Sequence, residues 1–213
     1  MSKLPDLLLF DQQLTEEELA IQKTVRDYCD KSLMPRIQKA NREELFDKEI
    51  YKELADLGLL GPHIKGYGCS GVSNVAYGLI LHELERGDSG LRSFASVQGS
   101  LVMYPIHKFG SENQKEKWLK DLGTGKKIGC FGLTEPDHGS NPGGMITNFK
   151  DDGDHVILNG AKMWISNSPF ADIAVVWAKN EENRIKGVIV ESNSAVSSST
   201  SICSKPHTQS KSE

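Results

Sequence analysis

Several features that mark particular classes of protein are missing from this sequence of 213 residues. No apolar run approaches the roughly 20 residues that a membrane-spanning helix needs, so the sequence predicts no membrane span. Lysine and arginine number 25 against 29 aspartates and glutamates, and no basic cluster stands out. The resulting net charge of -4 argues against a surface that binds nucleic acid.

Cysteine is scarce as well. The four cysteines have neither metal-ligand nor redox spacing, so we expect reduced thiols in the cytoplasm or the mitochondrial matrix. The histidines are scattered and indicate no metal site. The first residues, Met-Ser-Lys-Leu-Pro-Asp, resemble neither a signal peptide nor a transit peptide. We therefore expect a cytoplasmic protein, or a mitochondrial matrix protein if a transit peptide is missing from this sequence.

The first half of the sequence has the pattern of amphipathic helices. Capping boxes at Thr15–Glu18 and Ser111–Gln114 should begin two of them. Pro35 and Pro105 should end two, because proline lacks the amide that a helix interior uses. The helices are expected over about residues 16–33, 48–57, 74–86, 91–104 and 112–122.

A glycine-rich segment lies between the second and third of these helices. Gly66, Gly68 and Gly71 have the GxGxxG spacing of dinucleotide-binding turns. That function requires a preceding strand within a βαβ unit, whereas here a helix and a turn precede the glycines. We therefore interpret the segment as a loop.

From Lys127 onward the apolar residues follow the period of strands. Asn159-Gly160 is a strong signal for a type I′ hairpin turn. Helices followed by strands, without alternation, predict the α+β class with a helical bundle ahead of a sheet. The strands are expected at residues 128–133, 155–158, 161–166, 173–178 and 186–190.

Two motifs in the second half combine loop-forming residues with hydroxyl groups. Residues 131–140 read Phe-Gly-Leu-Thr-Glu-Pro-Asp-His-Gly-Ser, and residues 162–168 read Lys-Met-Trp-Ile-Ser-Asn-Ser. Glycine allows a backbone to approach a ligand closely, and the hydroxyls of Thr134, Ser140 and Ser166 supply donors and acceptors. Each residue alone would also suit a polar turn in a sheet protein.

Taken in order, the helical region and these two motifs resemble the acyl-CoA dehydrogenase family of flavoproteins over about residues 8–191. The resemblance implies an N-terminal helical domain at 1–125 and a partial, barrel-like middle β-domain at 126–191. Residues 192–213 are rich in serine and poor in apolar residues, so we expect a disordered tail. Family chains continue into a four-helix C-terminal domain, and this sequence therefore resembles a truncated product.

The resemblance also implies FAD as the cofactor. In the family the first motif holds the flavin ring through backbone groups and the threonine hydroxyl. The second motif places a tryptophan against the isoalloxazine ring and a hydroxyl near N5; the usual threonine is Ser166 here. The predicted FAD-binding residues are Phe131, Gly132, Leu133, Thr134, Ser140, Trp164, Ile165 and Ser166.

Within the family, residues 85–98 most resemble glutaryl-CoA dehydrogenase, in which an arginine and a serine four residues later meet the distal carboxylate of the substrate. Arg92 and Ser96 share a helix face, and a guanidinium can bind a carboxylate through two hydrogen bonds. On spacing alone, an ion pair between Arg92 and Asp88 is the simpler interpretation. With the resemblance, the predicted substrate-binding residues are Arg92, Ser93, Ser96 and Ser140.

The family reaction removes the α-proton of an acyl thioester with a carboxylate base while the β-hydride passes to the flavin. That base is a glutamate of the C-terminal domain, and no match to its motif occurs here, so no catalytic residue is predicted. Glu85 and Glu135 are expected to be solvated or ion-paired. The implied partners are an acyl-CoA substrate, electron-transfer flavoprotein as electron acceptor, and further subunits of a homotetramer.

Three functions remain open. The first is oxidation and decarboxylation of glutaryl-CoA to crotonyl-CoA by the complete protein, with this chain alone inactive. The second is a short- or branched-chain acyl-CoA dehydrogenase or an acyl-CoA oxidase, for which Arg92 would have no use. The third is a non-catalytic chain that binds a nucleotide, acyl-CoA or a full-length relative, as the missing base would allow.

Overall fold

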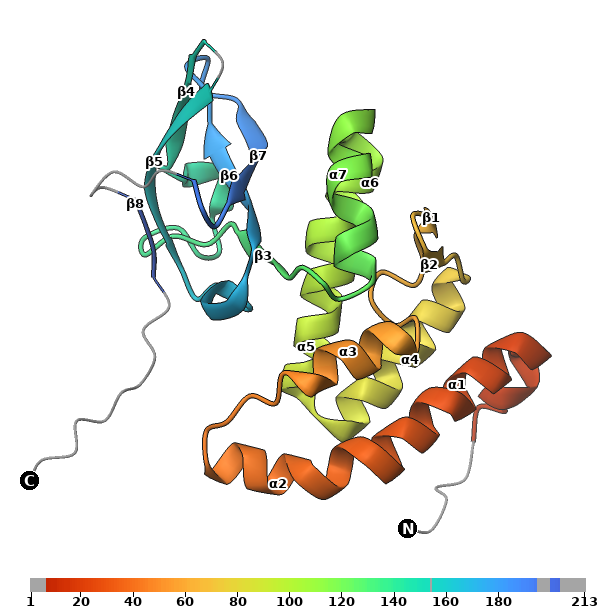
Figure 1. Ribbon diagram of the computed structural model, residues 1–213. Coiled ribbons are helices and arrows are strands. Elements are labelled where there is room, and N and C mark those ends of the chain that lie inside the picture. Colours follow the sequence, from red (N-terminus) through yellow and green to blue (C-terminus); the bar gives the residue numbers. More distant parts are fainter. Residues whose placement is uncertain (1–6, 154, 195–199, 204–213) are drawn as a thin grey trace, which may run out of the picture.

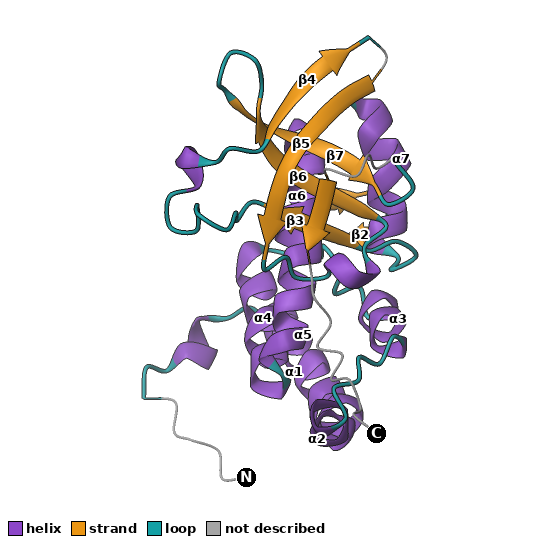
Figure 2. Ribbon diagram, turned by 90° about the vertical axis from the view of Figure 1, so that its left-hand side faces the viewer, coloured by secondary structure: helices purple, strands orange, loops and turns teal. Residues whose placement is uncertain are grey.

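The computed structural model describes residues 7–153, 155–194 and 200–203. Helices from the first half of the chain gather on one side of the molecule, and strands from the second half form a sheet on the other (Figure 1). After a quarter turn, the sheet lies over one end of the helical half (Figure 2). The α+β class is therefore confirmed.

The helical half begins and ends its helices largely where local signals predict. Thr15 and Ser111 each form a reciprocal capping box, as expected. The core of this half is apolar and includes Leu33, Leu54 and Leu84, all with no exposed surface. The α-helices are α1 (Glu16–Tyr28), α2 (Met34–Arg42), α3 (Glu49–Asp56), α4 (Asn74–Gly87), α5 (Ser89–Ser96), α6 (Tyr104–Phe109) and α7 (Glu112–Gly123).

The two prolines expected to end helices do not end them. Pro35 lies in the first turn of α2 and Pro105 in the first turn of α6. Each of these helices is preceded by a π-helical segment, Cys29–Leu33 and Val97–Met103 respectively. A π-helical turn changes the hydrogen-bonding partner of each amide, so the chain continues although proline has no N–H to donate.

The glycines of the GxGxxG segment belong to a small antiparallel hairpin. Strands β1 (Lys65–Gly66) and β2 (Cys69–Ser70) pair with each other, and all three glycines have positive φ angles. Glycine adopts that backbone conformation at little cost. The segment expected to be a loop is therefore a short hairpin, and in the described residues its two strands pair only with each other and form no βαβ unit.

The sheet is mixed and open in the described part of the chain. Its strand order is β3-β6-β4-β5-β8, and β7 pairs with β6. Strands β3 and β6 are parallel, whereas β6 and β7 are antiparallel. The strands are β3 (Gly129–Gly132), β4 (Asn148–Asp152), β5 (His155–Met163), β6 (Ile173–Lys179), β7 (Ile185–Glu191) and β8 (Thr200–Cys203).

The hairpin turn predicted at Asn159-Gly160 was wrong. Strand β5 runs straight through both residues, and the turn lies instead between Asp152 and His155, after a strand β4 that the sequence pattern did not reveal. Gly160 is needed for close packing and not for a turn. A Cβ atom there would lie 2.7 Å from the Cα atom of Thr147, so glycine is required where the two segments cross.

Residues 192–213, expected to be disordered, include a segment with strand structure. Thr200–Cys203 forms β8, whose backbone pairs in parallel with residues 160–163 of β5. The edge of β5 offers hydrogen-bonding groups that even a serine-rich segment can use, because the ladder is made by the backbone. Residues 195–199 and 204–213 lie outside the described residues.

A buried glutamine joins the two halves. Gln98, with no exposed surface, donates from Nε2 to the carbonyl oxygens of Leu122 and Lys127, both at 3.0 Å. Its Oε1 atom accepts a hydrogen bond from the Gly129 amide at 2.8 Å. All three bonds are buried or partly buried, so they fix the start of β3 against the helices.

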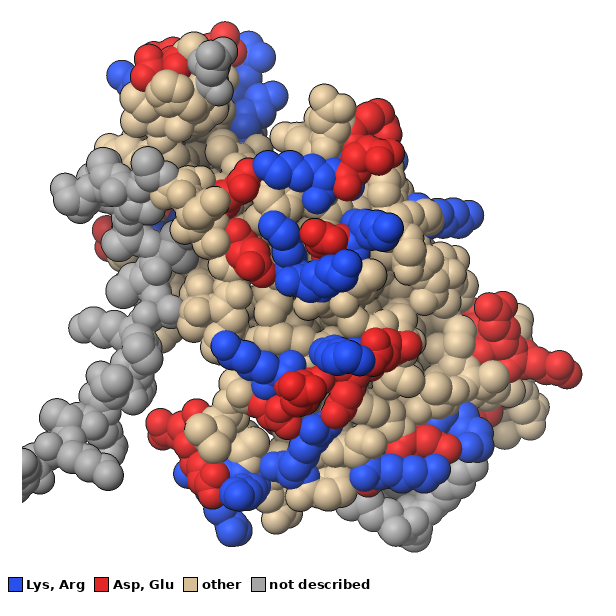
Figure 3. Space-filling model, in the orientation of Figure 1, with Lys and Arg blue, Asp and Glu red and all other residues tan. Residues whose placement is uncertain are grey.

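Membrane-spanning helices, metal-binding groups and disulfide bonds would each indicate another functional class. Within the described residues, no helix is long and apolar enough to cross a membrane. The same part of the chain contains no group of three metal-ligating side chains. Cys29, Cys69 and Cys130 are free thiols. Basic and acidic side chains are interspersed on the face shown in Figure 3.

Candidate functional site

The first motif leaves strand β3 and runs beside the end of β5. The carbonyl oxygen of Leu133 accepts a hydrogen bond from Lys162 Nζ at 2.9 Å. The carbonyl oxygen of Thr134 accepts one from the Met163 amide, also at 2.9 Å. These bonds place the Leu133-Thr134 backbone next to the residues that lead into Trp164.

Trp164 is presented to the surface by an unusual backbone conformation. Its φ angle is +61°, and 83% of the residue is exposed. The neighbouring residue Ile165 is buried, and Asn167, also at positive φ, donates to the Gly129 carbonyl oxygen at 3.2 Å. A bulky residue at positive φ is rare and costs free energy. The anchored backbone therefore holds a large flat indole out of the core.

The three hydroxyls that the sequence singled out remain available for a ligand. Ser140 and Ser166 are exposed, and Thr134 is half-buried. None of the three side chains forms a hydrogen bond with another residue in the described part of the chain. Each can therefore donate to or accept from a bound molecule.

Other residues of the two motifs pack within the protein. Phe131 contacts the edge of Trp177, with ring centroids 6.0 Å apart. Gly132 is buried, and a Cβ atom there would lie 3.3 Å from Lys162 Cγ. Ile165 belongs to the core of the sheet. For these three residues the structure shows packing, while a role in holding a cofactor stays a prediction.

A buried ion pair connects the motifs. Glu135 was expected to be solvated or ion-paired, but its partner Lys162 and its burial were not predicted. Glu135 and Lys162 are only 2% and 3% exposed, and Lys162 Nζ lies 2.8 Å from Glu135 Oε1. The carboxylate also accepts hydrogen bonds from the amides of Ile146, at 2.8 Å, and Thr147, at 3.0 Å.

Electrostatics keep this glutamate ionised. Burial raises the pKa of Glu135, but the hydrogen bonds from Lys162 and from the two backbone amides together lower it well below its usual range. A carboxylate held in this way is a weak base, so Glu135 does not suit proton abstraction. Only a weak sequence signal pointed to this pair, because the first motif also contains Asp137 and His138.

Arg92, predicted to bind substrate, is already in an ion pair. Its Nε atom lies 2.5 Å from Glu85 Oε2 across one helix junction, and 37% of the Arg92 side chain is exposed. The pairing with Asp88 that spacing suggested was wrong, because Asp88 caps α5 by accepting a hydrogen bond from the Leu91 amide at 2.8 Å. Ser96 donates to the Ser93 carbonyl oxygen at 3.0 Å.

A cavity of about 370 Å³ lies between the helices and the loop after Trp164. It brings Ser93 of α5 together with Ser166, one residue from each predicted binding set. Arg92, Ser96, Ser140 and Trp164 are outside its lining. The cavity is lined by Ile37, Ala40, Asn41, Leu45, Phe46, Asp47, Ile50, Asp88, Gly90, Leu91, Ser93, Phe94, Ser166, Asn167 and Phe170.

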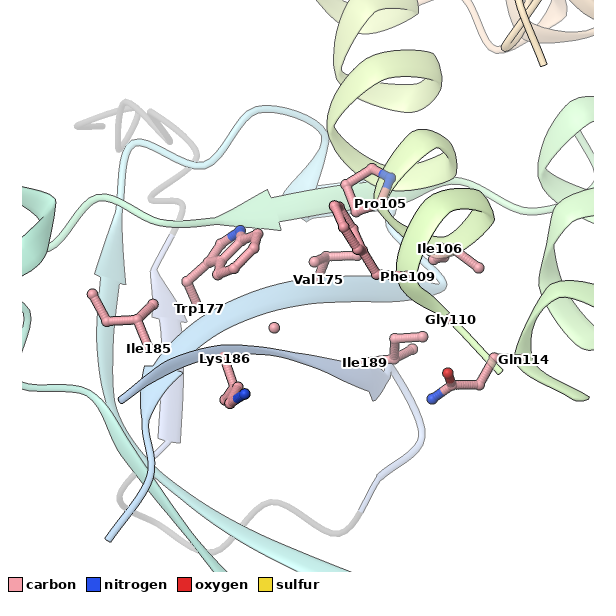
Figure 4. A pocket seen from close by; sticks show the side chains of 11 residues that line it. Pro105, Ile106, Phe109, Gly110, Gln114, Val175, Trp177, Ile185, Lys186 and Ile189 are labelled. Carbon is pink, nitrogen blue, oxygen red and sulfur yellow. The ribbon is translucent and has the colours of Figure 1, made fainter. Parts of the chain in front are cut away.

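A larger cavity, of about 470 Å³, lies between α6 and strands β6 and β7. Its walls are mostly apolar, with Trp177 and Val175 on the sheet facing Phe109 and Pro105 on the helix (Figure 4). None of the predicted binding residues lines this cavity. The candidate site is therefore the surface formed by the two motifs and the beginning of α5.

Comparison with known proteins identifies the family. Residues 15–126 match the family model of the acyl-CoA dehydrogenase N-terminal domain, and residues 130–207 match that of the acyl-CoA dehydrogenase middle domain. The chain therefore belongs to the acyl-CoA dehydrogenase family, as the two motifs predicted.

Individual relatives agree with this assignment. Over 173 residues the chain is 37% identical to the mitochondrial short-chain specific acyl-CoA dehydrogenase of Rattus norvegicus, covering 81% of this chain and 42% of the relative. A glutaryl-CoA dehydrogenase from Mycobacterium smegmatis, solved in complex with FADH2, is 50% identical with a TM-score of 0.84, over 86% of this chain and 47% of that one.

Butyryl-CoA dehydrogenase from Megasphaera elsdenii is 35% identical with a TM-score of 0.78, over 84% of this chain and 49% of that one. The chain thus spans about half the length of the relatives it matches.

Proposed function

We propose that this chain forms the helical and flavin-facing part of an FAD-dependent acyl-CoA dehydrogenase that oxidises and decarboxylates glutaryl-CoA to crotonyl-CoA. Two observations support glutaryl-CoA as the substrate. Identity to a glutaryl-CoA dehydrogenase is 50%, against 35% to a butyryl-CoA dehydrogenase. In addition, α5 carries an arginine beside Ser93, which lines the smaller cavity.

The residues present suit a flavin. The exposed indole of Trp164 offers a flat apolar surface for the ring, and the free hydroxyls of Thr134 and Ser166 lie on the two segments that flank it. FAD, when bound, supplies the acceptor for the hydride that leaves the substrate. Thr134, Ser140 and Ser166 would bind its polar edge, while Trp164 would cover one face and exclude water.

The proposed choice of substrate depends mainly on the hydrogen bonding of Arg92. Only its Nε atom is engaged by Glu85, so the two terminal amino groups of the guanidinium can bind a carboxylate. We propose that they bind the distal carboxylate of glutaryl-CoA, with Glu85 fixing the orientation of the guanidinium. Ser93 and Ser96 would supply hydroxyls on the same side of α5.

The base that removes the α-proton is proposed to come from outside this chain. The two glutamates near the candidate site are both occupied, Glu135 by Lys162 and Glu85 by Arg92. We therefore expect the chain alone to hold FAD weakly and to lack dehydrogenase activity. Electron-transfer flavoprotein as acceptor, assembly as a homotetramer, and a location in the cytoplasm or the mitochondrial matrix are part of the same proposal.

The substrate proposal is tested in a chain completed with the second half of the M. smegmatis relative. Arg92→Ala should lower kcat/KM for glutaryl-CoA about a hundredfold or more. The Arg92 side chain is 37% exposed in this chain, but bound substrate is proposed to cover it, and breaking a charge pair that is shielded from water costs several kcal/mol, with each ~1.4 kcal/mol worth tenfold. The kcat/KM for straight-chain acyl-CoA of similar length should fall far less. Arg92→Lys is the matched control, because it keeps the charge but not the two-bond geometry. Its kcat/KM for glutaryl-CoA should lie between the values of the wild type and of Arg92→Ala.

Equal losses on both substrates would indicate that Arg92 supports the fold or the common CoA portion. The second candidate, a short-chain acyl-CoA dehydrogenase, would then be favoured, in keeping with the 37% identity to the rat enzyme. The third candidate, a non-catalytic binding chain, would be favoured if the completed protein bound acyl-CoA without turnover.

A further inference from the structure

One carboxylate closes the loop that follows the first motif. Glu135 stands at the start of this loop, and the amides of Ile146 and Thr147 at its far end both donate to the Glu135 side chain. The loop also turns back on itself at its beginning, where Glu135 and His138 exchange backbone hydrogen bonds. The Glu135 side chain therefore joins the two ends of the loop.

Lys162 ties that carboxylate to the second motif. Its ammonium group donates to Glu135 Oε1 at 2.8 Å and to the Leu133 carbonyl oxygen at 2.9 Å. The next residue, Met163, donates its amide to the Thr134 carbonyl oxygen at 2.9 Å, directly before Trp164. Lys162 thus contacts the first motif on both sides of Thr134.

Burial prevents Glu135 and Lys162 from exchanging each other for water. Neither charged group can turn to water, because both residues are almost fully buried. Thr147, whose amide donates to Glu135, also lies against Gly160 of β5, where no side chain would fit. These contacts hold the loop and the strand in one mutual position, in which both charged groups have partners.

We propose that Glu135 and Lys162 form a clamp that sets the distance between the Thr134 segment and Trp164, and so positions the surface that receives the flavin ring. The two are positioning residues, since neither is exposed to a ligand. This inference rests on the proposed function for the identity of the ligand, whereas the clamp itself is a property of the described residues.

A second buried glutamate provides a matched control. Glu83 of α4 has no exposed surface and is paired with Arg26 and Arg86, yet it lies within the helical half. Both Glu135→Gln and Glu83→Gln replace a buried, ion-paired carboxylate with a neutral group of the same shape. Only the first removes a contact of the motifs.

The experiment uses the whole 213-residue chain without and with FAD. Without FAD, amide hydrogen exchange is followed at Ile146, Thr147 and Met163. Glu135→Gln should accelerate exchange at all three about tenfold relative to the most protected core amides, because a weakened acceptor leaves buried donors unsatisfied. Glu83→Gln should leave these three relative rates within about twofold of the wild type.

With FAD as the probe, equilibrium dialysis should show affinity about tenfold weaker for Glu135→Gln and within about twofold of wild type for Glu83→Gln, because misplaced binding groups lose most of their contribution. Lys162→Arg should retain more affinity than Lys162→Met, since it keeps a buried donor and charge.

The outcomes separate the clamp from the proposed function. Unchanged protection of Met163 in Glu135→Gln, or equal loss of FAD affinity in Glu83→Gln, would overturn the clamp. Absence of FAD binding by the wild-type chain, both alone and when completed with the second half of its relative, would instead remove the flavin from the proposed function. The clamp would then still be tested by the rate of amide hydrogen exchange at Met163.

Discussion

The helical half and the sheet each contain a buried glutamate, and the cations paired with the two glutamates differ greatly in their exposure to water. Glu83 is paired with Arg26 and Arg86, whose side chains are 39% and 31% exposed. Glu135 is paired with Lys162, whose side chain is 2% exposed. A partly exposed cation can be replaced by water, whereas a buried one cannot. The same residue type therefore supports packing between helices in one region and fixes a loop in the other.

The largest effect is expected from removing the buried cation. Lys162→Met should lower the free energy of unfolding by about 3–5 kcal/mol, because it leaves an uncompensated charge inside the protein. Arg26→Met is the control: it also removes a partner of a buried glutamate, but Glu83 keeps Arg86 and gains access to water. Urea unfolding measures both, and equal losses would show that the difference in exposure has no energetic consequence.

The double variant Glu135→Gln/Lys162→Met sharpens this result. It removes both charges, so it should be less destabilised than Lys162→Met alone. A double variant that is as unstable as the sum of the two single variants would contradict direct coupling between Glu135 and Lys162.

The next effect concerns the crossing of the loop and β5. Gly160→Ala should cost about 2–3 kcal/mol, because the new Cβ would overlap Thr147 and the φ angle of +147° disfavours a side chain. Gly153→Ala shares a positive φ, +70°, but meets nothing within 4 Å. It should cost only about 1 kcal/mol. Thermal unfolding of the two variants compares them directly.

Acid should affect the sheet through Glu135. The folded pKa of Glu135 is lowered from 4.5 to about 2, so its stabilising contribution is complete above the unfolded pKa. That contribution is lost as the pH falls from about 4.5 toward 2, because the unfolded chain binds the proton first. Glu135→Gln should therefore flatten the fall in stability over this range, measured by urea unfolding at several pH values.

The exposed Glu181→Gln serves as the control for the acid experiment and should leave the slope nearly unchanged. An equally steep acid dependence in Glu135→Gln would show that other carboxylates account for it. The pKa of Glu83 is also lowered. Burial raises this pKa, but the hydrogen bonds from Arg26 and Arg86 lower it by more than burial raises it. The helical half should therefore contribute a part of the acid dependence that Glu135→Gln does not remove.

The smallest effect should have the opposite sign. Trp164→Gly should stabilise the chain by about 1 kcal/mol or less, because glycine accepts the φ angle of +61° and the exposed indole makes few contacts to lose. The same change should weaken FAD binding in the completed protein. A loss of stability would mean that the indole packs in solution more than its exposure indicates.

Short-range patterns predicted much of this molecule correctly. The capping boxes at Thr15 and Ser111 and the change from helices to strands after Lys127 all depend on residues close together in the sequence. The two motifs predicted the family for the same reason, since each is a continuous segment.

The errors have a common physical origin. Pro35 and Pro105 were expected to end helices, but a π-helical segment ahead of each moved the proline into a first turn. Gly160 was expected in a turn because it follows an asparagine, but it lies within a strand where Thr147 crosses. In each case a contact or a shift of hydrogen bonding outside the local pattern decided the outcome.

The sequence by itself determined that a helical half precedes the main sheet, and it determined the two motifs and the residue types that are predicted to bind a flavin and a carboxylate. Those properties are local, because they follow from propensity, capping and chemical identity. The tertiary structure alone decided that Glu135 pairs with Lys162, 27 residues away, and that Arg92 pairs with Glu85 and not with Asp88. Which charges meet depends on how the segments pack, and burial then makes that meeting energetically decisive.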